Sequence, residues 1–123
     1  MKSSSVVLLQ IDPGIAQSLT ASLLSSFHSV HAVRSMEELR TSVLKHRAKV
    51  VILDMEMAPL PEVERLSHEF PGLSVVCTHR LADEEMWTAA LSAGASDICP
   101  TYDTHSILTA AVRNATRAHS AAA

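Results

Sequence analysis

Five short apolar runs, each separated from the next by a segment of helical periodicity, constrain the fold of this chain more than any other feature. The runs occupy residues 6–11, 30–33, 50–53, 73–77 and 97–99. They lack polar alternation, which is typical of strands buried on both faces of a parallel sheet. Between the runs, apolar residues recur every three or four positions, for example at Ile15, Leu19, Leu23 and Phe27.

Capping signals mark the starts of several helical segments. Pro13 suits a first helical turn, and Ser35 is followed three residues later by Glu38 in a capping-box pattern. Asp103 or Thr104 can cap the last helix. Strands that alternate with helices pair in parallel and are connected by right-handed crossovers. We therefore predict an α/β fold, a flavodoxin-like, doubly wound, five-stranded parallel sheet of order 2-1-3-4-5 with five helices.

Length and charge limit the classes of function open to the chain. Its 123 residues predict one domain, residues 1–119, followed by a short tail, residues 120–123. The net charge of −3 gives no basic face for direct contact with nucleic acid, and no apolar run approaches the roughly 20 residues of a membrane span. The two cysteines, Cys77 and Cys99, are expected to be reduced thiols that pack as small core residues. These features predict a cytoplasmic protein.

Polar residues follow the predicted strands at the edge of the sheet where doubly wound folds bind their ligands. Parallel strands bring their carboxyl ends to one edge, and sites form there where the strand order reverses. The residues at this carboxyl edge are Gln10, Ile11, Asp12, Asp54, Glu56, Thr78, His79, Arg80, Thr101 and Tyr102. Asp54 is therefore expected among other polar groups and not alone on a surface.

Four motifs make the chain resemble a response-regulator receiver domain of two-component signalling along nearly its whole length. They are IDPG after the first run, VVILDMEM around Asp54, LSVVCTH ending near Thr78, and ALSAGASDIC before the last loop. The resemblance implies that Asp54 is the position that accepts a phosphoryl group from a histidine kinase. It also implies a magnesium ion held by two adjacent acids after the first strand. The phosphoryl oxygens are then bound by the hydroxyl at Thr78 and by a lysine in the last loop, because the transfer depends on cationic stabilisation.

The position of the acid pair is occupied differently in this chain. Counting back from Asp54, the pair falls on Gln10 and Ile11. Asp12 follows directly. An alternative register places Asp12 inside the pair, and Ile11 or Pro13 then fills the other place. Either register leaves at most one acid.

Two further positions of the family's site differ as well. The lysine of the last loop corresponds to Thr101, and the aromatic switch residue of the fifth strand corresponds to Ile98. Thr101 can donate a hydrogen bond but cannot neutralise a phosphoryl oxygen. Each missing carboxylate removes several kcal/mol of attraction for a cation at ~4 Å, if the effective dielectric constant is about 20. We therefore expect no cofactor and weak magnesium binding at best, with Asp12, Asp54 and Glu56 as the ligands if a metal binds.

Neighbouring residues could restore part of the missing charge. Glu56 lies two residues beyond Asp54 and could turn its carboxylate toward the site. His79 or Arg80, in the loop after the fourth strand, could take the place of the family's lysine. With these compensations, the chain would be a working receiver that is phosphorylated on Asp54 through a modified site.

A protein interface is expected beside the fourth and last helices, where receiver domains meet their partners. Trp87, Tyr102 and Ile107 are the candidate interface residues, although packing in the core also explains Trp87. The partner would be a protein of a signalling pathway, such as a histidine kinase or an output domain, and a homodimer is a further alternative.

The favoured reading is an atypical receiver, or pseudo-receiver, in phosphorelay signal transduction. It would act as a protein-interaction or dimerisation module, not as an enzyme, with little or no magnesium-dependent phosphorylation. The working receiver described above is the main alternative. A small flavodoxin-like enzyme or ligand binder is a remote one, because none of the three glycines lies in a G-x-G arrangement.

Overall fold

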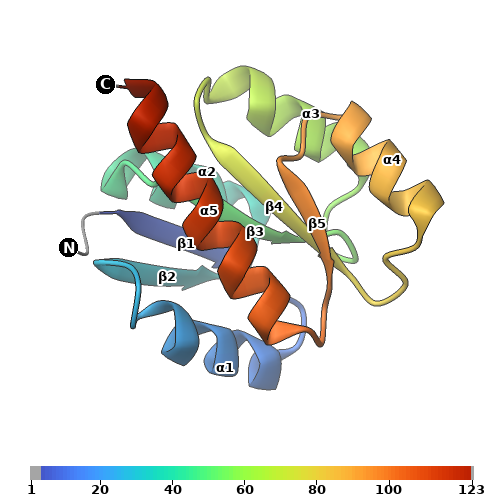
Figure 1. Cartoon of the computed structure of the whole chain (residues 1–123), viewed down its shortest axis with the longest axis horizontal. Helices are drawn as coiled ribbons and strands as arrows, with labels where there is room; N and C mark the ends of the chain where they lie inside the picture. Colours follow the sequence, from blue (N-terminus) through green and yellow to red (C-terminus); the bar gives the residue numbers. More distant parts are fainter. Residues whose placement is uncertain (1–3, 123) are drawn as a thin grey trace.

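The computed structural model describes the backbone of residues 4–122 and the side chains of residues 4–116. Five strands form one parallel sheet in the order β2-β1-β3-β4-β5, which confirms the predicted fold class (Figure 1). The strands are β1 (Ser5–Leu9), β2 (Ser29–Val33), β3 (Val50–Asp54), β4 (Ser74–His79) and β5 (Asp97–Pro100). The helices are α1 (Pro13–Leu23), α2 (Met36–His46), α3 (Leu60–Glu69), α4 (Glu84–Ser92) and α5 (Thr104–Ala122).

The residues predicted as a tail begin within the last helix. Residues 120–122 continue the backbone of α5, and residue 123 lies outside the described residues. Within the described residues, no helix is long and apolar enough to cross a membrane.

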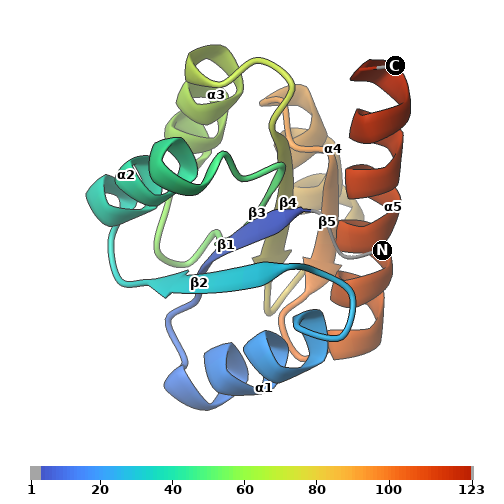
Figure 2. The same cartoon turned by 90° about the vertical axis from the view of Figure 1, so that its left-hand side faces the viewer.

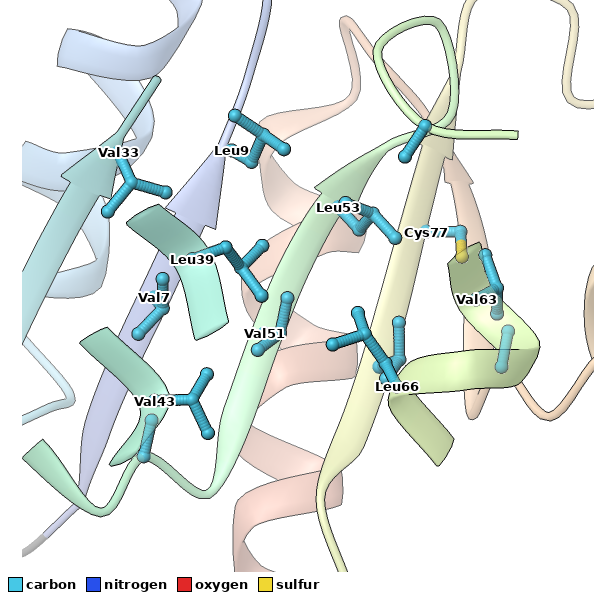
Figure 3. Packing of buried hydrophobic residues seen from close by; sticks show 14 of the residues in the cluster. Val7, Leu9, Val33, Leu39, Val43, Val51, Leu53, Val63, Leu66 and Cys77 are labelled. Atoms are coloured by element: carbon cyan, nitrogen blue, oxygen red, sulfur yellow. The ribbon is translucent and has the colours of Figure 1, made fainter. Parts of the chain in front are cut away.

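The sheet lies between two helical layers, and each face has its own apolar core. Helices α1 and α5 cover one face, where Leu8 and Ile52 contact Leu19 and Ile107 (Figures 1 and 2). Helices α2, α3 and α4 cover the other face, and Figure 3 shows Leu39, Val43 and Leu66 pointing onto it. Because both faces are covered, the middle strand β3 is buried at every residue, as its uninterrupted apolar sequence predicts.

Side-chain caps mark the starts of every described helix except α3. The carboxylate of Asp12 accepts hydrogen bonds from the N–H groups of Gly14 and Ile15, so α1 starts at Pro13. This early start ends β1 at Leu9, two residues before the predicted end of the first apolar run. Gln10 and Ile11 therefore lie in the loop between β1 and α1.

Three later helices have caps of the same kind, and at α4 the carboxylate of Asp83 accepts from the N–H of Met86. Ser35 accepts from the N–H of Glu38, while the Glu38 carboxylate reaches the N–H of Arg34, one residue before the position of a standard capping box. Asp103, and not Thr104, caps α5, through the N–H of Ser106.

Gly94, at the end of α4, is required both by its backbone conformation and by its closeness to α3. Its φ angle is +109°, and a Cβ atom there would lie 2.5 Å from Oγ of Ser67.

We expect Gly94→Ala to lower the free energy of unfolding by about 2–3 kcal/mol, from backbone strain and steric overlap. Gly72 is a matched control, since its φ is +90° but nothing lies within 4 Å of its Cβ position. Gly72→Ala should cost about 1 kcal/mol in urea unfolding, and equal losses would contradict the predicted close contact.

Candidate functional site

The structure brings the predicted polar residues together at the carboxyl edge of the sheet. Asp54 of β3 pairs in register with Thr78 of β4, and Gln10 follows Leu9, which is opposite Leu53. Thr101 follows the last residue of β5. Gln10, Asp54, Thr78 and Thr101 are all buried. A row of four polar side chains therefore closes one end of the apolar core.

Asp54 is entirely enclosed by the protein, with an exposed fraction of 0%. Its Oδ2 atom accepts a hydrogen bond from the N–H of Ile11 at 3.0 Å. Its Oδ1 atom accepts one from the N–H of Glu56 at 2.9 Å. The carboxylate therefore joins the loop after β1 to the loop after β3, and each of its oxygens has a backbone donor.

The other three buried residues of this row each have a neutral polar atom without a hydrogen-bond partner in the described part of the chain. Within the described part of the chain, Nε2 of Gln10, Oγ1 of Thr78 and Oγ1 of Thr101 make no hydrogen bond to protein. A buried polar atom left without a partner costs about 1–3 kcal/mol. These three groups can donate hydrogen bonds, but none of them carries a positive charge.

The remaining acids of the site are held by other contacts. The exposed carboxylate of Asp12 caps α1, as described above. Ile11, at a position where the resemblance implies an acid, is 55% exposed and has an apolar side chain. Glu56 accepts a hydrogen bond from Nε of Arg80 at 2.7 Å, in an ion pair that links the loops after β3 and β4.

The candidate compensating residues are likewise engaged. The hydrogen bond and the charge of Glu56 raise the pKa of Arg80, and Tyr102 adds a smaller contribution of the same sign. Nδ1 of His79 accepts a hydrogen bond from the N–H of Leu81, so the ring is held by its own loop. Glu56 and Arg80, each considered as a rescue for the lost charges, neutralise each other.

These contacts do not fit a magnesium site. Magnesium requires near-octahedral oxygen ligation, usually with one or two carboxylates and several waters. Across residues 4–116, no group of three or more His, Cys, Asp or Glu side chains is placed to hold a metal ion. Each of the three acids named from the sequence already has partners. Asp12 caps the start of α1, Asp54 accepts from two loop N–H groups, and Glu56 is paired with Arg80.

Residues at the predicted switch and interface positions have different exposures. Ile98 is buried in the core beneath α2, α3 and α4. Trp87 and Tyr102 are exposed, which an interface role requires. The prediction for Ile107 is wrong: its side chain is fully buried against α1 and the sheet, so it is not available to a partner.

The two thiols are core residues, as predicted. Cys77 pairs with Ile98, and Cys99 pairs with Thr78, so the cysteine side chains point to opposite faces of the sheet. Burial raises the pKa of Cys77 to about 12 and that of Cys99 to about 11. Both thiols therefore stay protonated at neutral pH and are poor nucleophiles.

Comparison with known proteins identifies the fold. No protein family model matches the chain, and no curated protein matches its sequence. Among solved structures, the CheY-like protein TadZ of Pseudomonas aeruginosa PAO1 is 28% identical, with a TM-score of 0.75 over 92% of this chain and 93% of that chain. The N-terminal signal receiver domain of a two-component response regulator from Bacteroides fragilis is 22% identical, with a TM-score of 0.83 over 91% and 96%. The receiver domain of the Francisella response regulator 1452 is 14% identical, with a TM-score of 0.82 over 94% and 98%. The structural neighbours are response-regulator receiver domains, and this chain has their fold.

Proposed function

We propose that this chain is a non-enzymatic, atypical receiver domain that acts in signalling by binding proteins, without phosphorylation of Asp54. The full burial of Asp54, with a backbone N–H on each carboxylate oxygen, carries this proposal. A phospho-acceptor has to present a free oxygen in line with the phosphodonor. Each oxygen of Asp54 keeps a lone pair beside its N–H donor, but the side chain is fully buried, so the loops after β1 and β3 would have to open before a phosphodonor could reach it.

The charges around Asp54 support the same conclusion. Phosphoryl transfer is catalysed mainly by cations placed on the transferred group. Gln10, Thr78 and Thr101 offer only neutral donors, and the guanidinium of Arg80 is paired with Glu56. A phosphoryl group on Asp54 would therefore place its negative charge in a buried site without a free cation among the described side chains.

The exposed aromatic residues near α4 and β5 indicate where a signalling partner would bind. Trp87 and Tyr102 are 47% and 67% exposed. Tyr102 is the next residue after Thr101, which belongs to the buried site. Aromatic side chains are enriched at protein interfaces. We propose a protein partner, such as a histidine kinase or an output domain, at this surface.

Incubation with acetyl phosphate and magnesium, followed by intact-mass measurement, tests the proposal. We expect no mass gain of one phosphoryl group, because no cation stabilises the transfer to the enclosed carboxylate. Asp54→Asn is the control, since it removes the acceptor oxygen with little change in shape. A gain of one phosphoryl group that is absent in Asp54→Asn would show a working receiver with a modified site.

A further inference from the structure

One side of the molecule is built from a long stretch of sequence without charge. Residues 13–33 contain no Asp, Glu, Lys or Arg, although 19% of the whole chain is charged. The stretch includes the whole of α1 and β2. A helix on a solvated surface normally carries charged residues on its outer face. The outer face of α1 instead presents Gln17, Ser18 and Ala21.

A mainly apolar groove of about 850 Å³ runs along this side. Its walls come from α1, from the end of β2 and from the loop after β1. Ile11, which precedes α1, and Leu24, which follows it, both line the groove and are 55% and 45% exposed. This surface therefore has a groove with a large exposed apolar side chain near each end of α1, Ile11 at one end and Leu24 at the other.

The edge of the sheet beside this groove is unprotected. Figure 2 looks onto β2, the edge strand, with α1 below it. Natural proteins usually protect edge strands with charged residues or proline. The opposite edge, β5, contains Asp97 and Pro100, whereas β2 has the sequence SVHAV. Burial, together with His46 and Lys45, lowers the pKa of His31, so β2 is uncharged at neutral pH.

We propose that a second copy of this chain covers the surface formed by α1 and β2, in a twofold-symmetric dimer. A twofold axis brings each surface against itself, so any charge near the axis would meet its own copy. The absence of charge over residues 13–33 removes that repulsion from α1 and β2 themselves, although Lys45 of α2 remains close enough to His31 to lower its pKa. The axis also pairs the two β2 edges antiparallel, and each edge supplies the hydrogen-bonding groups that the other lacks.

The same symmetry matches the apolar features of the groove. Antiparallel α1 helices place Leu24 of one copy near the Ile11 end of the groove in the other. Arg34 follows the carboxyl end of β2 and lines the groove. Antiparallel pairing puts the two Arg34 side chains at opposite ends of the joined strands, so they do not repel each other. The proposed dimer does not depend on whether Asp54 is phosphorylated.

Sedimentation equilibrium of the full chain over a range of concentrations tests the proposal. We expect a mass that rises with concentration toward twice that of the 13.2 kDa chain. Leu24→Glu and Ala32→Arg each place two charges in the dimer interface and should raise the dissociation constant at least about a hundredfold. Circular dichroism should show that both variants remain folded, because both positions are exposed.

Trp87→Glu is the matched control. Trp87 is a large apolar side chain on α4, with about the same exposure as Leu24. It should leave the dissociation constant unchanged. A chain that stays monomeric at every concentration would overturn the proposal, and so would a dimer that Trp87→Glu dissociates while Leu24→Glu and Ala32→Arg do not. A dimer with no mass gain from acetyl phosphate would support both proposals, and a dimer that is phosphorylated on Asp54 would overturn only the proposed function.

Discussion

Asp54→Ala is expected to lower the free energy of unfolding by about 2–4 kcal/mol, although the resemblance to receiver domains would make Asp54 the phospho-acceptor. The substitution leaves the N–H groups of Ile11 and Glu56 without acceptors and opens a small cavity at a fully buried site. In a site made of clustered acids, removal of one carboxylate would relieve repulsion. Here Asp12 and Glu56 are engaged elsewhere, so little repulsion is available to offset the loss.

Asp12→Ala provides the matched comparison for Asp54→Ala. Both carboxylates accept hydrogen bonds from two backbone N–H groups, but Asp12 is exposed. Because water can solvate the freed donors of α1, Asp12→Ala should cost about 1 kcal/mol. Urea unfolding at neutral pH measures both changes. A loss for Asp54→Ala that is equal to or smaller than that for Asp12→Ala would show that Asp54 does not hold the two loops.

Ile11→Asp combined with Thr101→Lys is expected to raise magnesium affinity at least about tenfold, which corresponds to about 1.4 kcal/mol. The backbone of residue 11 lies beside Asp54, since its N–H bonds to that carboxylate, so an aspartate there adds negative charge close to Asp54 even though the Ile11 side chain lines the groove beside α1. An added carboxylate at ~4 Å attracts a divalent cation by several kcal/mol, if the effective dielectric constant is about 20. The lysine would supply the cation that a phosphoryl group needs.

Titration of the amide spectrum with magnesium measures this gain. Ile11→Asn with Thr101→Lys is the control, because asparagine has the shape of aspartate without its charge. The control should show no gain in affinity. If the double variant with aspartate also shows no gain, a charge added at residue 11 does not act on a cation beside Asp54, and the assignment of residue 11 to the acid pair is wrong.

The sheet and the location of the site were predictable because both depend on strong, local patterns. Uninterrupted apolar runs and helical periodicity indicated a parallel sheet, and the parallel strands then placed Asp54, Thr78 and Thr101 at one edge. Ile107 was also predictable in principle. It is spaced three and four residues from Ala110 and Ala111, which are buried with it on one face of α5.

The contacts that decide the chemistry were not predictable. The enclosure of Asp54 depends on the conformations of two loops, which bring the N–H groups of Ile11 and Glu56 to one carboxylate. The pairing of Glu56 with Arg80 depends on long side chains from loops far apart in the sequence. From the sequence alone, either residue could replace a missing charge of the site, and only their relative positions show that they bind each other.

A magnesium titration of the unmodified chain tests whether the contacts around Asp54 exclude a metal ion from the folded site. The amide signals of Ile11 and Glu56 report on the two N–H groups that bond to Asp54, and that of Thr78 reports on the neighbouring strand. We expect no saturable shift of these signals with magnesium. A saturable shift centred on Ile11 and Glu56, with tight binding, would contradict this expectation.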